Sequence, residues 1–408
     1  MRYNELHEYL KKRIDFEPEV IELPELSQRV RNHRFGSVAH KLLQSVETPL
    51  FDPLPDKSGV TDSDSDAARE TYAITKVPDH RIPENKDFAF HALQPNEGDA
   101  DRVIILLHGF NERNWGKYLP WASLLAEGTG AAVAMFPIAF HMNRSPSAWN
   151  DPHLMRSVSQ LRKKAFPRVQ QSTLSNAAIS VRMSENPARF FWSGLQSFHD
   201  VGELGRLIRK GAFPGIKKDA RIDFFTYSIG TLLGEIVLMT DEDGLFRDSR
   251  MVAFCGGPVF NRLSPVSKFI LDSEASVALY SYLVEHLTSH IKENQNLASY
   301  LSGDSVKVGM NIRSFLNYRL DRGYREDKLR DLSERIYALC LAKDEVVPYF
   351  EVINTLKGAA RDIDIRVDVE DFPFPYRHED PFPVGTKNAD AIDAAFRKVF
   401  ASSIEFLR

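Results

Sequence analysis

The sequence has few groups that could carry redox or metal chemistry. Only two cysteines, Cys255 and Cys340, occur among 408 residues, and both lie in apolar segments typical of strands. They could face each other on neighbouring strands, but buried reduced thiols are the simpler expectation, and neither is a good candidate nucleophile. The sequence also lacks C-x-x-C, H-E-x-x-H and the phosphate-binding G-x-x-x-x-G-K pattern. We therefore expect no metal ion, no nucleotide and no other cofactor.

Long apolar runs and a strong net charge are absent as well. No run approaches the roughly 20 residues that cross a bilayer, so we expect no transmembrane segment. The formal net charge is −4, with acidic and basic side chains well mixed, which argues against nucleic acid as a partner. Residues 1–8 are polar and lack the apolar core of an export signal, so a cytoplasmic protein is expected.

A serine at the end of an apolar, β-favouring run is the most informative feature that is present. The run ends at Ser228, and residues 229–237 then repeat apolar side chains at helical spacing. A serine at such a turn exposes its hydroxyl, and the helix behind it directs N–H groups at a nearby oxyanion. This nucleophile elbow is usually G-x-S-x-G; Gly230 keeps the second glycine, whereas Thr226 replaces the first. The pattern predicts acyl transfer on Ser228.

Two more predicted strands end next to the groups that would activate such a serine. Residues 335–342 are apolar and are followed by Asp344, whose carboxylate could orient a histidine. Residues 363–369 alternate apolar and charged side chains, as a strand at a sheet edge does. The proline-rich loop after them contains His378, the only histidine after Asp344.

These features together resemble the α/β-hydrolase superfamily over roughly residues 70–408. The resemblance rests on three features: the chain order Ser228, Asp344, His378; the elbow; and the loop 108–110 after an unbroken apolar run. It implies a mostly parallel sheet of about eight strands with helices on both faces, and a site at the carboxyl ends of the central strands. His108 in that loop is expected to be structural.

The resemblance also implies a mechanism. Ser228, His378 and Asp344 would form a catalytic triad, and the backbone amides of Phe110 and Ile229 would form the oxyanion hole. The expected protein is a serine hydrolase, of the carboxylesterase or lipase kind, that cleaves an ester, thioester or amide of a small-molecule acyl substrate. Two alternatives stay open: a hydrolase-like protein that binds without turnover, and an acyltransferase that uses the same triad.

Each of these residues also has an ordinary interpretation. Ser228 could be a simple turn residue, Asp344 could cap the following helix, and His378 could be a solvated loop histidine. Glu345 and Asp380 are alternative carboxylates for orienting the histidine.

The rest of the chain divides into an extension, a connector and two insertions. We expect a helical N-terminal extension over residues 1–57, a flexible connector over 58–68, and the hydrolase domain over 69–408 with a strand at 72–74. Insertions at about 141–186 and 261–332 are expected to be helical and to form a lid or cap. The second insertion could instead add packing layers or form the surface of a homodimer.

The polarity of the substrate is not decided by the sequence. The aromatic loop 372–376 and Trp149 suggest an apolar pocket, whereas Arg377, His141 and Arg144 would favour an anionic substrate.

Overall fold

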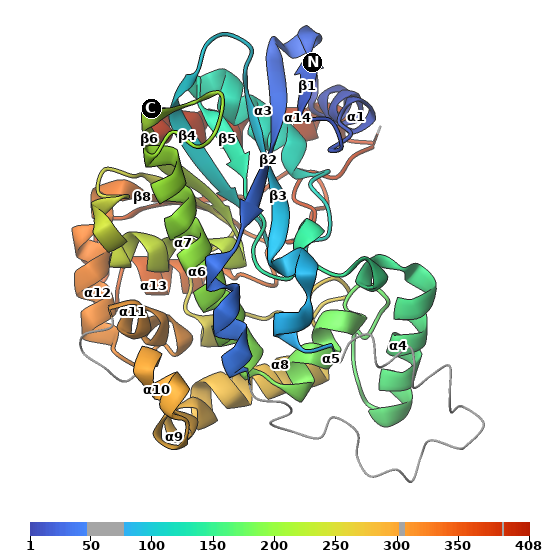
Figure 1. Ribbon diagram of the computed structural model, residues 1–408, viewed down its shortest axis with the longest axis vertical. Helices are drawn as coiled ribbons and strands as arrows, with labels where there is room; N and C mark the ends of the chain where they lie inside the picture. Colours follow the sequence, from blue (N-terminus) through green and yellow to red (C-terminus); the bar gives the residue numbers. More distant parts are fainter. Residues whose placement is uncertain (47–76, 302–306, 386) are drawn as a thin grey trace.

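The computed structural model describes residues 1–46, 77–301, 307–385 and 387–408, and a single large sheet organises them (Figure 1). Nine strands lie in the order β1-β2-β3-β5-β4-β6-β7-β8-β9. The pairs from β1 to β5 are antiparallel, and every pair from β5 to β9 is parallel. This is the α/β-hydrolase fold, as predicted. The strands are β1 (Val20–Leu23), β2 (Gln28–Gly36), β3 (Asp87–Pro95), β4 (Ala100–Leu107), β5 (Ala132–Met135), β6 (Ile216–Tyr227), β7 (Met251–Phe254), β8 (Ile336–Leu341) and β9 (Arg366–Glu370).

Helices cover both faces of the sheet. Helices α6 and α7 pack on one face, and α1, α3 and α14 form the layer on the other. The helices are α1 (Tyr3–Arg13), α3 (Tyr118–Thr129), α4 (Pro152–Ala165), α5 (Ala177–Glu185), α6 (Ala188–Arg209), α7 (Ile229–Thr240), α8 (Ser273–Tyr280), the π-helix η12 (Ser281–His286), α9 (Leu287–Glu293), α10 (Gln295–Leu301), α11 (Lys307–Leu316), α12 (Arg322–Asp331), α13 (Tyr349–Leu356) and α14 (Ala389–Leu407). No helix in the described ranges is long and apolar enough to cross a bilayer.

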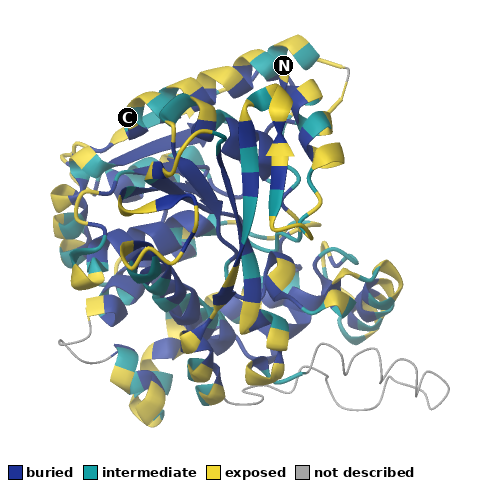
Figure 2. Cartoon of the chain, turned by 45° about the horizontal axis from the view of Figure 1, so that its top comes forward, coloured by how far each residue is buried: buried dark blue, intermediate teal, exposed yellow. Residues whose placement is uncertain are grey.

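The unbroken apolar run in β4 has a simple structural cause. Successive side chains of a strand point to opposite faces, and both faces of this sheet are covered. Val103, Ile105 and Leu107 therefore belong to the core under α6 and α7, whereas Ile104 and Leu106 belong to the core under α3 and α14. Figure 2 shows the resulting buried strands between helices whose outer surfaces are exposed.

The N-terminal segment differs from the prediction, and so does the number of strands. Residues 3–13 form the helix α1, as predicted, but residues 20–36 contribute β1 and β2 to the main sheet, so the predicted eight strands are nine. Each residue of β2 is paired with β3. The amphipathic pattern in this stretch was wrongly interpreted as helical. The segment forms a strand because it pairs with the edge of β3. The predicted connector 58–68 and the predicted strand at 72–74 lie outside the described residues.

Both predicted insertions contain helices and lie beyond the carboxyl ends of the strands. The first contains α4 and α5 and follows β5; the second contains α8 to α12 and follows β7. In Figure 1, α4, α5 and α8 to α10 lie below the sheet, and α5 packs against α8. The two insertions therefore meet beyond the sheet edge at which the parallel strands end.

Candidate active site

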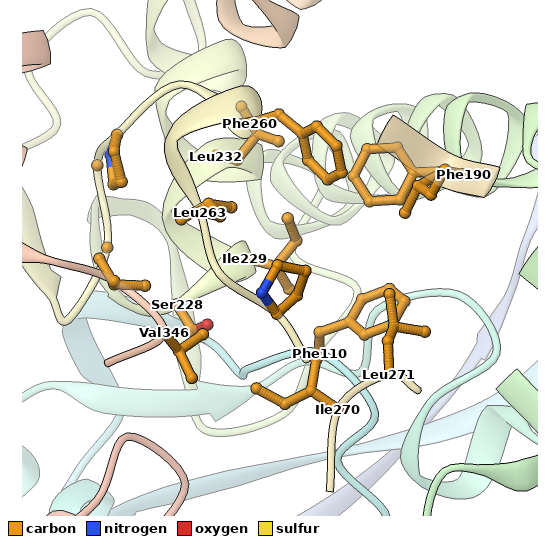
Figure 3. A pocket seen from close by; sticks show the side chains of 16 residues that line it. Phe110, Phe190, Ser228, Ile229, Leu232, Phe260, Leu263, Ile270, Leu271 and Val346 are labelled. Atoms are coloured by element: carbon orange, nitrogen blue, oxygen red, sulfur yellow. The ribbon is translucent and has the colours of Figure 1, made fainter. Parts of the chain in front are cut away.

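Ser228 lies at the sharp turn between β6 and α7. Its backbone has φ 56° and ψ −123°, a region that residues other than glycine rarely occupy. The Ser228 N–H donates to the Phe254 carbonyl at 3.2 Å, which ties the turn to the end of β7. The side chain is half-buried, and its hydroxyl faces a cavity (Figure 3). The strained conformation is the one expected of a nucleophile elbow.

Gly230 allows the start of α7 to lie against the end of β4. A Cβ atom on this residue would lie 2.6 Å from the Leu107 carbonyl oxygen and 2.8 Å from that of His108. Both neighbours are backbone atoms, so neither could rotate away. The absence of a side chain at Gly230 therefore brings the Ile229 amide next to the loop that carries Phe110.

Thr226 fits into the elbow, where a glycine is usual, because a glycine on the facing helix leaves space for its side chain. Its hydroxyl lies 3.1 Å from the Val252 carbonyl oxygen and 3.0 Å from the Thr231 hydroxyl. Its methyl group faces Gly234 on α7, where a Cβ would lie 3.0 Å from that methyl and 2.6 Å from the Met251 sulfur. The space that a glycine at 226 would supply is thus supplied by Gly234. Gly234 was not among the predicted site residues, although a glycine inside a helical pattern is a signal of close packing.

Replacing Gly230 with alanine is expected to destabilise the protein and to displace the elbow. The added methyl would overlap two carbonyl oxygens, and overpacking of this kind costs about 1–3 kcal/mol in the free energy of unfolding. Urea denaturation measures the effect. Gly323→Ala is a matched control. Gly323 is an exposed residue of α12, and a methyl group there would have no atom within 4 Å, so this variant should be no less stable than the native protein. Equal stability of the Gly230→Ala variant and the native protein would contradict the close approach.

The structure brings Ser228, His378 and Asp344 together in one hydrogen-bonded chain. Nε2 of His378 lies 2.8 Å from the Ser228 hydroxyl oxygen, and Nδ1 lies 2.7 Å from Oδ2 of Asp344. The side chains of His378 and Asp344 are only 3% and 1% exposed. Because the carboxylate has only acceptors, Nδ1 carries the proton that it shares with Asp344, which leaves Nε2 to accept from the serine hydroxyl.

The second oxygen of Asp344 fixes the carboxylate in place. Oδ1 accepts from the amides of Val346 and Val347, both at 2.9 Å. Asp344 does not cap α13, whose N-cap residue is Pro348. The alternative carboxylates, Glu345 and Asp380, are both exposed. Asp344 is therefore the carboxylate that orients the histidine ring.

The loop that carries His378 is anchored by hydrogen bonds from residues that were not among the predicted site residues. The Tyr227 hydroxyl donates to the His378 carbonyl oxygen, and the two rings stack with centroids 5.4 Å apart. Lys117 donates to the Glu379 carbonyl oxygen at 2.9 Å, and the Ser267 hydroxyl donates to the Glu379 carboxylate. Because these anchors come from distant segments, no local pattern in the sequence could have indicated them.

The two predicted oxyanion-hole residues line the same cavity as the serine. Phe110 follows β4 and Ile229 follows Ser228 directly, and both border the cavity. Among the described residues, neither backbone amide donates to an acceptor. His108 is structural, as expected: it is fully buried, and its Nε2 accepts from the Ile138 amide at 2.9 Å. Burial also lowers the pKa of His108 well below its usual value, so the ring is neutral.

The two cysteines offer no competing nucleophile. Both are buried and free, which confirms the expectation of reduced thiols. Burial raises the pKa of Cys255 and of Cys340 well above the usual thiol value, so neither forms the reactive thiolate at neutral pH. In the described part of the chain, no group of three or more histidine, cysteine, aspartate or glutamate side chains could hold a metal ion.

The cavity beside Ser228 is almost entirely apolar. It has an empty volume of about 570 Å³, part of which is open to solvent, and among the described residues Ser228 supplies the only polar side chain in its lining. Figure 3 shows the rings of Phe190 and Phe260 next to each other in this lining, with centroids 5.1 Å apart. The second insertion contributes the following lining residues: Leu263, Pro265, Ile270, Leu271 and Leu279.

Several residues considered for the substrate pocket lie elsewhere. Trp149 does not line this cavity; it is buried with its ring 6.4 Å from that of Phe140. The phenylalanines of the loop 372–376 pack into the core beneath α14. Arg144 is buried in an ion pair with Asp200 at 2.8 Å, so it is not free for an anion.

Comparisons with known proteins find one family and a set of solved structures. The profile of a protein family described as "Family of unknown function (DUF6051)" matches residues 1–408. No curated protein matches the sequence. Similar solved structures include the esterase Est22, with 11% identity over 99% of this chain and 87% of that chain and a TM-score of 0.46. A thermostable esterase from Pseudomonas putida ECU1011 has 9% identity over 91% and 98%, with a TM-score of 0.43. A carboxyl esterase 2 from the fungus Tuber melanosporum has 12% identity over 78% and 81%, with a TM-score of 0.41.

Proposed function

We propose that this chain, which belongs to the DUF6051 family, is a serine hydrolase of the α/β-hydrolase type. The substrate would be an ester, thioester or amide of a small molecule with an apolar acyl group. One observation carries this proposal: the continuous hydrogen-bonded chain from Asp344 through His378 to Ser228, which ends at the wall of an apolar cavity.

The geometry fits acyl transfer through a covalent intermediate. His378 would take the Ser228 proton on Nε2, while Asp344 holds the ring and stabilises its charged form. The serine oxygen would attack the substrate carbonyl, and the amides of Phe110 and Ile229 would bind the resulting oxyanion. The leaving group would take the proton from His378. Water would then hydrolyse the acyl-enzyme in the reverse sequence of proton transfers.

The alternative of a silent, hydrolase-like binding protein has lost its main support. That alternative depended on Thr226, which could have displaced the serine. Gly234 accommodates the threonine, and Ser228 keeps the strained elbow conformation.

We also propose that residues 261–332 form a lid over the nucleophile. Five residues of this insertion line the cavity that contains the Ser228 hydroxyl, and Ser267 bonds to the loop of His378 through Glu379. A layer added only for packing or for a homodimer would not need to reach the serine. The predicted start of the hydrolase domain at residue 69 does not fit this sheet, because β1 and β2, within residues 20–36, are two of its strands.

Turnover of a simple activated ester tests the proposed function. The native protein is expected to release p-nitrophenol from p-nitrophenyl butyrate, with a burst equal to the enzyme concentration if hydrolysis of the acyl-enzyme is slow. Stopped-flow absorbance measures the burst and the steady state. If the folded protein gave no release above the buffer rate for any ester from acetyl to dodecanoyl, a binding protein would replace the hydrolase.

A further inference from the structure

Lys117 is bonded to two separate loops of the candidate site. One is the oxyanion loop, residues 108–112, with which Lys117 forms an ion pair through the Glu112 carboxylate. The other is the histidine loop, residues 376–381, where Nζ of Lys117 donates to the Glu379 carbonyl oxygen at 2.9 Å. The side chains of Lys117 and Glu112 are only 17% and 21% exposed. The pair is therefore shielded from solvent, unlike a surface salt bridge.

The ion pair belongs to a hydrogen-bonded chain that begins at the backbone of the oxyanion loop. The Gly109 N–H donates to the Tyr118 hydroxyl at 3.0 Å, and this hydroxyl donates to Oε1 of Glu112 at 3.2 Å. Burial and the charge of Glu112 raise the pKa of Tyr118 well above its usual value, so the phenol keeps its proton and stays a donor. From Glu112 the chain continues through Lys117 to the Glu379 carbonyl. It therefore joins the backbone of one loop to the backbone of the other.

Both ends of this chain lie next to groups of the proposed mechanism. One end is the residue before Phe110, and the other is the residue after His378. Between them, Nζ of Lys117 lies over the ring of Tyr227, 4.6 Å from its centroid, and Tyr227 directly precedes Ser228. The ammonium group is therefore in contact with segments that carry the oxyanion amide, the nucleophile and the base.

Stabilisation of α3 does not explain the lysine. Lys117 is the N-cap residue of this helix, where serine, threonine, aspartate and asparagine are preferred, and its side chain makes no capping bond. A positive charge is unfavourable at this end of a helix, because the helix dipole is positive there. Contact with the substrate does not explain it either, since neither Lys117 nor Glu112 lines the cavity beside Ser228. The bonds of the lysine side chain are with the two loops.

We propose that Lys117 and Glu112 are positioning residues for the reaction: their ion pair holds the oxyanion loop and the histidine loop at the separation at which the Phe110 amide and Nε2 of His378 reach the same substrate. This inference rests on the proposed function, because it assigns residues to that reaction. A displacement of about 1 Å at a reacting centre can cost about a hundredfold in rate. Loss of the link should therefore lower kcat, whereas KM should change little, because the substrate contacts the cavity lining and not this pair.

Lys117→Met is expected to lower kcat on p-nitrophenyl butyrate by about 30- to 100-fold, with KM within about threefold of the native value. Methionine fills similar space but has neither the charge nor the N–H groups. End-point labelling with a fluorophosphonate counts the reactive sites, so that kcat is obtained per site. Lys398→Met is the matched control, because Nζ of Lys398 pairs with Glu370 at 2.7 Å outside both loops, and it should keep the native constants. Native kcat per site in Lys117→Met would overturn the proposal.

A double variant separates positioning from the cost of an unpaired charge, and it also serves if Lys117→Met alone does not fold. Lys117→Met leaves the Glu112 carboxylate without its partner, which by itself destabilises a protein. Adding Glu112→Gln removes that charge, so the melting temperature should rise again. The link to Glu379 is still missing, so kcat should stay about tenfold or more below the native value. Recovery of native kcat in the double variant would show that the pair is only structural and would overturn the proposal.

Amide hydrogen exchange separates this inference from the proposed function, because it needs no turnover. In Lys117→Met, mass spectrometry should find exchange about fivefold faster or more in the peptides that contain residues 108–112 and 376–381, and native exchange in Lys398→Met. Faster exchange of both loops in a protein without esterase activity would support the link and reject only the hydrolase. Native exchange rates in both loops of Lys117→Met would reject the link, whatever the activity.

Discussion

Ser228→Ala is expected to lower kcat for ester hydrolysis by about a millionfold. The hydroxyl oxygen that it removes lies 2.8 Å from Nε2 of His378, and no other nucleophile of the described residues lines the cavity beside Ser228. Alanine keeps the Cβ atom of the serine, so the change removes only the hydroxyl. Steady-state kinetics on p-nitrophenyl butyrate measures the loss, and thermal unfolding checks that the variant folds.

Two companion variants make this prediction specific. His378→Ala should cost a similar factor, and the double variant should be no slower than either single one, because the two side chains act as a unit. Ser157→Ala, at a half-buried serine of α4 that does not line the cavity, should keep the native rate. Near-native turnover in Ser228→Ala would show that the hydroxyl is not the nucleophile.

Asp344→Asn is expected to lower kcat about ten-thousandfold. The asparagine carbonyl can keep the two bonds from the amides of Val346 and Val347, which turns its NH₂ group toward His378. Nδ1 must then accept a hydrogen bond, so the ring proton moves to Nε2. With that proton in place, Nε2 can no longer accept the proton of the Ser228 hydroxyl. The fold should survive the change, because the backbone contacts remain. Kinetics on the same ester measures the effect.

The exposed neighbour of Asp344 provides the matched control. Glu345→Gln also replaces a carboxylate with an amide, one residue away, on a side chain that is exposed to solvent. Because surface substitutions usually have small effects, kcat should stay within about twofold of the native value. If Asp344→Asn kept full activity while Glu345→Gln or Asp380→Asn lost it, a different carboxylate would orient the histidine.

The positions of the candidate site residues could be predicted because each follows a strand that is recognisable by itself. The strands before Ser228, Asp344 and the Phe110 loop are buried on both faces, so they appear in the sequence as apolar runs. The strand before His378 lies at the sheet edge and alternates instead. In a parallel sheet these carboxyl ends meet at one edge, which is why a one-dimensional order predicts a three-dimensional cluster.

The parts that could not be predicted depend on contacts between distant segments. Strand β2 looked helical because its pairing with β3, about 60 positions later in the chain, is invisible in a local window. The fit of Thr226 depends on Gly234 across a strand-to-helix contact. The cavity beside Ser228 is bordered by segments from Phe110 to Val347, which no local pattern places together. Local patterns thus predicted the chain order of the site residues, whereas the shape of the cavity depends on packing between distant segments.

Covalent labelling with a fluorophosphonate probe tests the central claim most directly. This reagent reacts with a serine only when a neighbouring base activates it and an oxyanion site accepts the phosphonyl oxygen. Tandem mass spectrometry of the labelled protein should find one adduct, on Ser228, in the native protein and none in Ser228→Ala. An unlabelled native protein with intact folding, or an adduct on another residue, would contradict the account.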